Sequence, residues 1–76
     1  MDPAKQVLLD KNANWFTYHS PTPEQLPLLQ EIRDAGKALV DVIAKNTPIC
    51  ADQSAAIRHV REATMTANAA IMCGGK

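Results

Sequence analysis

Apolar residues recur every three or four positions along two long stretches of this 76-residue chain. The first series is Leu29, Ile32, Gly36, Leu39, Val40 and Ile43. The second series is Ala56, Ile57, Val60, Ala63, Thr64, Ala67 and Ile71. This spacing predicts one apolar face on each of two helices, and the short connection over residues 46–51 favours antiparallel packing. We therefore predict an all-α fold built around a helical hairpin.

Local signals indicate where both hairpin helices begin and end. Thr22 and Gln25 match a capping box, and a proline follows the threonine at the favoured first helical position. Asp52 is the residue expected to cap the second helix. The Asn-Thr-Pro sequence at residues 46–48 should end the first helix, and Gly74–Gly75 should end the second.

The residues before the hairpin are expected to form an arm. Residues 2–10 can form about two turns of helix, and residues 12–14, which include two asparagines, should end it. So short a helix must dock on another element to be stable. Trp15 and Phe16 are expected to pin the arm to the helices as a hydrophobic clasp, although they could instead line a pocket.

A second set of apolar residues widens the face of the first helix beyond what one partner helix covers. This set is Leu28, Ala35, Leu39 and Val42. A chain this short buries little surface alone and usually needs a disulfide, a metal or another subunit. We therefore predict that the arm, residues 1–14, and the hairpin domain, residues 15–76, assemble into a homo-oligomeric helical bundle with ligand sites at subunit boundaries.

Charge and composition exclude several classes of function. Eight basic and eight acidic residues give zero net charge, whereas duplex-DNA binders usually have a basic excess. No apolar run is long enough to span a membrane, and the N-terminus lacks the hydrophobic region of a signal peptide. We therefore expect a cytoplasmic protein that binds neither DNA nor membranes.

The cysteines do not indicate a disulfide or a metal site. Cys50 and Cys73 lie at opposite ends of the second predicted helix, too far apart for a disulfide, so reduced thiols are expected. A structural zinc site needs about four ligands at short spacings, and His19 and His59 do not complete such a set. We expect no metal and no cofactor.

Aromatic and cationic side chains around the start of the first helix are the best candidates for binding. Arg33 and Lys37 lie one turn apart, so their charges can converge on one anion. Tyr18 and His19 precede the helix and offer flat rings on which a base could stack. This combination suits a ligand that carries both a base and a phosphate.

Arg58, together with Arg61, gives a second basic site on the other helix. The alternative is an ordinary solvated surface, on which Glu31, Asp34 and Glu62 pair with the cations at little gain in stability. The sequence contains no Gly-rich phosphate loop and no recognisable nucleophile motif, so we do not expect an enzyme.

Two segments resemble a known family. They are YHSPTPEQLPLLQEIRDAGKALVDVI, at residues 18–43, and SAAIRHVREATMTANAAI, at residues 54–71. Their motif spacing is similar to that of the small helical-hairpin domain of phage cyclic-nucleotide sponges, the anti-CBASS and anti-Thoeris sponges. The resemblance covers about residues 15–72, which is most of the chain.

The resemblance implies a non-enzymatic protein that sequesters immune second messengers in the infected bacterium. These messengers are cyclic dinucleotides such as cGAMP, cyclic trinucleotides or cyclic ADP-ribose isomers. It also implies a homo-oligomer, commonly a hexamer, with pockets between subunits. By the family's spacing, Tyr18 would stack on a base and Arg33 would contact phosphate.

One position departs from the family. Many relatives have an arginine at the start of the second helix, which serves a separate trinucleotide pocket, and Gln53 stands there in this chain. A neutral amide lacks the charge-assisted contact to phosphate. The alternative function is a structural or assembly hairpin of a phage virion-associated protein, because similar hairpins occur fused to virion proteins.

Overall fold

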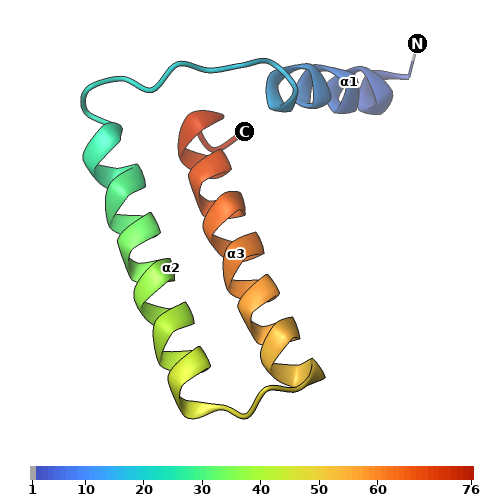
Figure 1. Cartoon of the computed structure of the whole chain (residues 1–76). Helices are drawn as coiled ribbons and strands as arrows, with labels where there is room; N and C mark the ends of the chain where they lie inside the picture. Colours follow the sequence, from blue (N-terminus) through green and yellow to red (C-terminus); the bar gives the residue numbers. More distant parts are fainter. Residues whose placement is uncertain (1) are drawn as a thin grey trace.

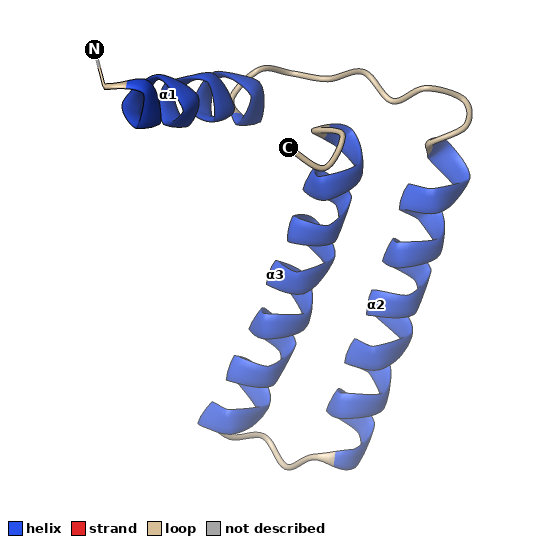
Figure 2. Cartoon of the chain, turned by 180° about the vertical axis from the view of Figure 1, so that it is seen from behind, coloured by secondary structure: helices blue, strands red, loops and turns tan. Residues whose placement is uncertain are grey.

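The computed structural model describes residues 2–76, and its regular secondary structure over that range is entirely helical. It comprises α1 (Pro3–Trp15), α2 (Leu26–Asn46) and α3 (Ala51–Met72). α2 and α3 pack side by side in opposite directions, and α1 extends sideways from the end where α2 begins and α3 ends (Figure 1, and Figure 2 from behind). The predicted helical hairpin is therefore confirmed.

The capping box forms, but the regular helix begins one turn after it. The Thr22 N–H donates to Gln25 Oε1 at 3.0 Å, and the Gln25 N–H donates to Thr22 Oγ1 at 3.3 Å. Residues 23–25 make a single turn, and α2 starts at Leu26. The regular helix starts late because Pro27 has no N–H to donate to the carbonyl of the residue four positions earlier.

Cys50, and not Asp52, caps α3. Its backbone is extended, and its Sγ accepts a hydrogen bond from the Gln53 N–H at 3.5 Å. Asp52 instead lies in the first turn, where a negative charge interacts favourably with the helix dipole. The prediction of Asp52 as the cap was wrong because a thiol is a weak acceptor that sequence rules do not count among capping groups.

α3 ends in a Schellman motif. The Gly75 N–H donates to the Ala70 carbonyl at 2.8 Å, and the Gly74 N–H donates to the Ile71 carbonyl at 3.1 Å. The φ angles of Gly74 and Gly75 are 67° and 76°, a region that glycine enters without steric cost. The predicted end of this helix is confirmed, as is the end of α2 at Asn46.

α1 is longer than the sequence predicted. Asp2 caps it as its position before a proline suggests, because Asp2 Oδ1 accepts from the Ala4 N–H at 2.9 Å. The helix then continues through residues 12–14, which were expected to end it, and stops at Trp15. Asparagine has only a weak preference against helix, and the side chain of Asn14 is held by a tertiary hydrogen bond to the Cys73 carbonyl at 3.2 Å.

The chain has almost no interior of its own. Of residues 2–76, Leu29 alone is buried, with 6% of its surface exposed. The accessible surface is 5984 Å², whereas a compact chain of this mass would have about 4,600 Å². The radius of gyration is 16.4 Å, against about 11 Å for a compact domain of this length. Apolar surface that a single chain would normally hide is therefore left open.

Gly36 allows the two long helices to approach closely. A Cβ placed on Gly36 would lie 2.5 Å from Thr64 Oγ1 on α3. Thr64 is held in this orientation because its hydroxyl donates to the Val60 carbonyl at 2.9 Å. A side chain at Gly36 would therefore force the helices apart in the middle of the hairpin.

We predict that Gly36→Ala destabilises the protein, although alanine favours helix over glycine by about 1 kcal/mol. The added methyl group meets the Thr64 hydroxyl. In a Thr64→Ala background, where that hydroxyl is gone, the same substitution should instead stabilise the fold by up to about 1 kcal/mol. Urea denaturation of the four proteins in this cycle measures both changes, and equal effects in the two backgrounds would contradict the predicted clash.

Candidate anion-binding groove

Two cavities lie on opposite sides of the line of contact between α2 and α3. Both are bordered by the same three central residues, Gly36, Val60 and Thr64. One cavity, of about 450 Å³, is completed by Ile32, Ala35, Leu39, His59 and Ala63, and we call it the apolar groove. The other, of about 260 Å³, is completed by Arg33, Lys37, Val40, Arg61 and Met65, and we call it the cationic groove.

Helix geometry explains how three cations reach one groove. Arg33 and Lys37 are one turn apart on α2, so they project from the same side of that helix. Arg61 follows Val60, which borders the line of contact between α2 and α3 (the α2–α3 seam). A helix turns about 100° per residue. That rotation places Arg61 at the edge of the contact between the helices, on the side of the cationic groove.

The charge in the cationic groove comes mainly from its two arginines. Lys37 Nζ pairs with Asp41 at 2.7 Å, and both the hydrogen bond and the attraction of that carboxylate raise the pKa of Lys37. This lysine is therefore charged at neutral pH but is partly neutralised. Neither Arg33 nor Arg61 forms an ion pair with any residue in the described part of the chain. The groove can thus attract an anion although the whole protein has no net charge.

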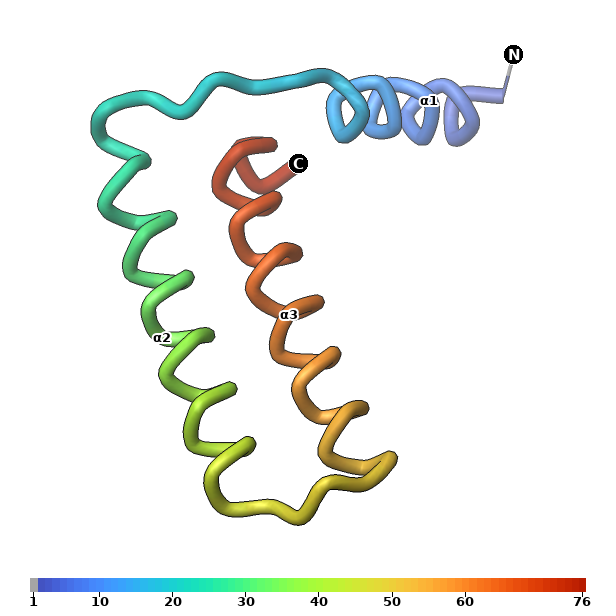
Figure 3. The backbone as a smooth tube through the Cα atoms, in the orientation of Figure 1, coloured from blue at the N-terminus to red at the C-terminus, as the bar shows by residue number. Residues whose placement is uncertain are grey.

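Tyr18 and His19 lie outside this groove, in the segment that crosses the open end of the hairpin between α1 and α2 (Figure 3). Tyr18 is 85% exposed and free to stack on a ring. The ring nitrogen Nε2 of His19 lies 2.8 Å from the Asn14 carbonyl, so that nitrogen donates and the imidazole holds the segment to α1. The structure of one chain brings Arg33 and Lys37 together but does not bring Tyr18 or His19 to them.

Arg58 also lies away from the cationic groove. Its Nε is 3.7 Å from Glu62 Oε1, and both side chains are exposed. His59 Nδ1 is 3.5 Å from the other oxygen of Glu62. A ligand-binding role for Arg58 stays a prediction, whereas Arg61 shares a cavity with Arg33. The sequence showed both arginines but not which of them faces α2, because that depends on how α3 is rotated about its axis.

The side chain of Gln53 binds main-chain carbonyls near the end of α2. Its Nε2 donates to the Thr47 carbonyl at 3.2 Å and to the Ala44 carbonyl at 3.5 Å. These carbonyls lie at the end of α2 and in the connection that follows it. The amide thus ties the connection to the start of α3.

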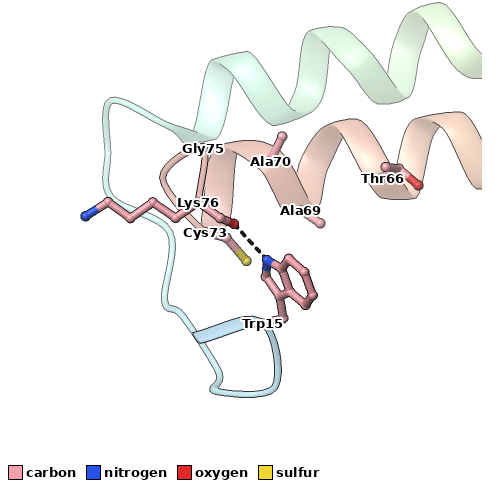
Figure 4. Close-up of a pocket in the computed structure, with 7 residues that line it drawn as sticks. All are labelled: Trp15, Thr66, Ala69, Ala70, Cys73, Gly75 and Lys76. Carbon is pink, nitrogen blue, oxygen red and sulfur yellow. Dashed lines mark hydrogen bonds between the residues drawn. The ribbon is translucent and has the colours of Figure 1, made fainter. Parts of the chain in front are cut away.

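Trp15 joins the arm to the hairpin, and Phe16 does not. The indole Nε1 of Trp15 donates to the Lys76 carbonyl at 2.7 Å, and the ring lies against the end of α3, beside Cys73 (Figure 4). The cavity between them is about 410 Å³. Phe16, which follows the last residue of α1, is 89% exposed. Trp15 therefore joins the arm to the hairpin as predicted, but through a hydrogen bond and with half of its surface exposed, and the predicted hydrophobic clasp is wrong for Phe16.

The thiols, the possible metal ligands and the apolar character of the helices complete the description of the chain. Cys50 and Cys73 are free thiols at the two ends of α3. No three His, Cys, Asp or Glu side chains within residues 2–76 are grouped closely enough to hold a metal ion. No helix in the same range has the length and apolar character needed to cross a membrane.

The chain is a small helical hairpin with a cationic groove between its two long helices. Its family is shown by a match to the family model described as "Acb2/Tad1, hairpin domain" over residues 9–72, and the chain belongs to that family. This is the family of the anti-CBASS and anti-Thoeris sponges, which are binding proteins and not enzymes, so the resemblance seen in the sequence is confirmed. No curated protein and no solved structure matches the chain significantly.

We predict that the arm is held to the hairpin mainly by two hydrogen bonds to main-chain carbonyls, from Asn14 and Trp15. Asn14→Ala and Trp15→Phe should each weaken docking by about 1 kcal/mol and speed amide hydrogen exchange in α1, while α2 is unchanged. Gln6→Ala is the control, because it removes only a contact to Asp10 within α1. Equal acceleration in α2 would show that the arm and hairpin are not separable.

Proposed function

We propose that this protein is a phage sponge that binds cyclic nucleotide second messengers of bacterial immunity and holds them without chemical change. Two observations support this proposal: the chain belongs to the sponge family, and two unpaired arginines share one groove although the whole chain has no net charge. Its ligand is a cyclic dinucleotide such as cGAMP, a cyclic trinucleotide or a cyclic ADP-ribose isomer. It acts in the cytoplasm of the infected bacterium.

In this proposal Arg33 contacts a phosphate through its planar fork of donors, Lys37 adds a second charge, and Tyr18 stacks on a base. Tyr18 is exposed and does not line the cationic groove of its own chain. We therefore place the complete site between subunits, where Tyr18 of one protomer closes the groove of another. His19 orients the segment that carries Tyr18, through its contact with Asn14.

Assembly of several copies is part of the proposal. The excess accessible surface and the single buried residue both support it, because apolar side chains remain open on the hairpin. The apolar groove offers a surface for a second copy, because its lining from α2 and α3 is rich in small residues. Leu28 and Val42 continue the row of Leu39 along α2 at helical spacing. A hexamer, as is common in the family, would leave the cationic grooves available to ligand.

The alternative, an assembly module of a phage virion-associated protein, has one observation in its favour. Val7, Leu8 and Leu9 on α1 are each about half exposed and could pack against another virion component. This role needs no ligand in the cationic groove and leaves its two unpaired arginines unexplained.

Thermal melts with a panel of cGAMP, cyclic triadenylate and a cyclic ADP-ribose isomer test the proposed function. A ligand at 100 times its dissociation constant adds about 2.7 kcal/mol to stability, so at least one should raise the melting temperature. Tyr18→Ala and Arg33→Ala should abolish that rise while leaving the oligomer intact by light scattering. Lys45→Ala, which removes an exposed positive charge elsewhere on α2, is the matched control.

Three other results would count against the proposal. A wild-type melting temperature that no messenger changes would favour the assembly module. A shift that survives in both the Tyr18 and Arg33 variants would place the site elsewhere. Chemically altered ligand, recovered after heat release, would mean that the protein is an enzyme.

A further inference from the structure

The carboxylates closest in sequence to the cationic groove are engaged by other partners. Asp41 holds Lys37, and Asp34 accepts a hydrogen bond from Gln30 Nε2 at 2.8 Å. On α3, Glu62 contacts Arg58 and His59. Arg33 and Arg61 are therefore left without a counter-charge from the described residues, although each has an acidic residue directly after it in the sequence.

The two arginines reach the same cavity from different helices. Arg33 belongs to α2 and Arg61 to α3, and Val40, Val60 and Met65 add apolar surface to the same cavity. Two positive charges that share one small groove repel each other, and a bound anion converts that repulsion into attraction. A single helix bearing both cations would present them along one edge, but here they face the groove from its two sides.

The chemistry of the groove suits a particular kind of anion. A guanidinium binds phosphate oxygens through two parallel hydrogen bonds, so two guanidiniums that line one groove from different helices favour two phosphates. The apolar surface that Val40, Val60 and Met65 give the groove suits the carbon-bound hydrogens of a ribose. The cavity of about 260 Å³ is smaller than a typical pocket for a whole ligand, so the bases of a larger ligand would extend out of it.

We propose that Arg61 is a second phosphate-binding residue, and that with Arg33 it makes the site selective for messengers carrying two or more phosphates. This inference rests on the proposed function and adds a residue from α3 to its site. The two arginines form a clamp across the α2–α3 seam. A cyclic mononucleotide, with a single phosphate, can engage only one side of the clamp.

Calorimetric titration tests this with the tightest-binding of cGAMP, cyclic triadenylate and a cyclic ADP-ribose isomer, and with cyclic AMP as the single-phosphate probe. Arg61→Ala should weaken the multi-phosphate ligand about 10- to 100-fold, the range for hydrogen bonds to charged groups. Binding of cyclic AMP should be weak and the same in both proteins. Arg61→Lys, which keeps the charge but lacks the fork, should recover only part of the affinity.

Lys45→Ala controls for the general loss of a positive charge and should bind like the wild type. The exposed position of Arg61 should leave folding intact, which circular dichroism verifies for each variant. The clamp is wrong if the wild type and Arg61→Ala bind the messenger equally well. It is also wrong if Arg61→Ala weakens the binding of cyclic AMP by the same factor as the binding of the messenger. In both cases the sponge function stands. If wild type binds none of the ligands, the sponge function itself fails, and the clamp with it.

Discussion

The approach of α2 to α3 at Gly36 determines most of what this molecule can do. The absent side chain brings the helix backbones together against Thr64, and the curved surfaces of two closely packed helices leave a groove on each side of their contact. The apolar groove and the cationic groove therefore share one origin. A wider spacing would open both grooves at once, so the packing of the hairpin and the shape of its binding surface cannot vary independently.

Charge is distributed locally, although the chain is neutral overall. Lys37 and Arg58 are matched with carboxylates one turn later on their own helices, whereas Arg33 and Arg61 are not. Lys5, Lys11, Lys45 and Lys76 also form no ion pair among the described residues and lie outside the cationic groove. The cationic groove brings its two unmatched arginines together in one cavity, beside Lys37. Such an arrangement attracts a small anion without the broad positive field that would also attract DNA.

The spacing of apolar residues and the signals for helix starts and ends predicted the hairpin, because both are local properties of the chain. The spacing of four between Arg33 and Lys37 likewise showed that they share a side of α2. The sequence could not show that Arg61 rather than Arg58 faces them, since this depends on the rotation of α3 set by packing at the seam. The cap at Cys50 and the length of α1 were missed for related reasons: a weak acceptor and tertiary hydrogen bonds decided them.

The arm is attached in an unusual way, through side chains of α1 that bind main-chain oxygens of Cys73 and Lys76. Every amino acid supplies such an oxygen, so the identity of the receiving residues is almost irrelevant to the attachment. Asn14 and Trp15, by contrast, are specified by their donor groups. In relatives, substitutions should therefore be tolerated at the residues that supply the carbonyl oxygens and disfavoured at the positions of Asn14 and Trp15. This attachment can thus be recognised in a related sequence only from the residues of α1.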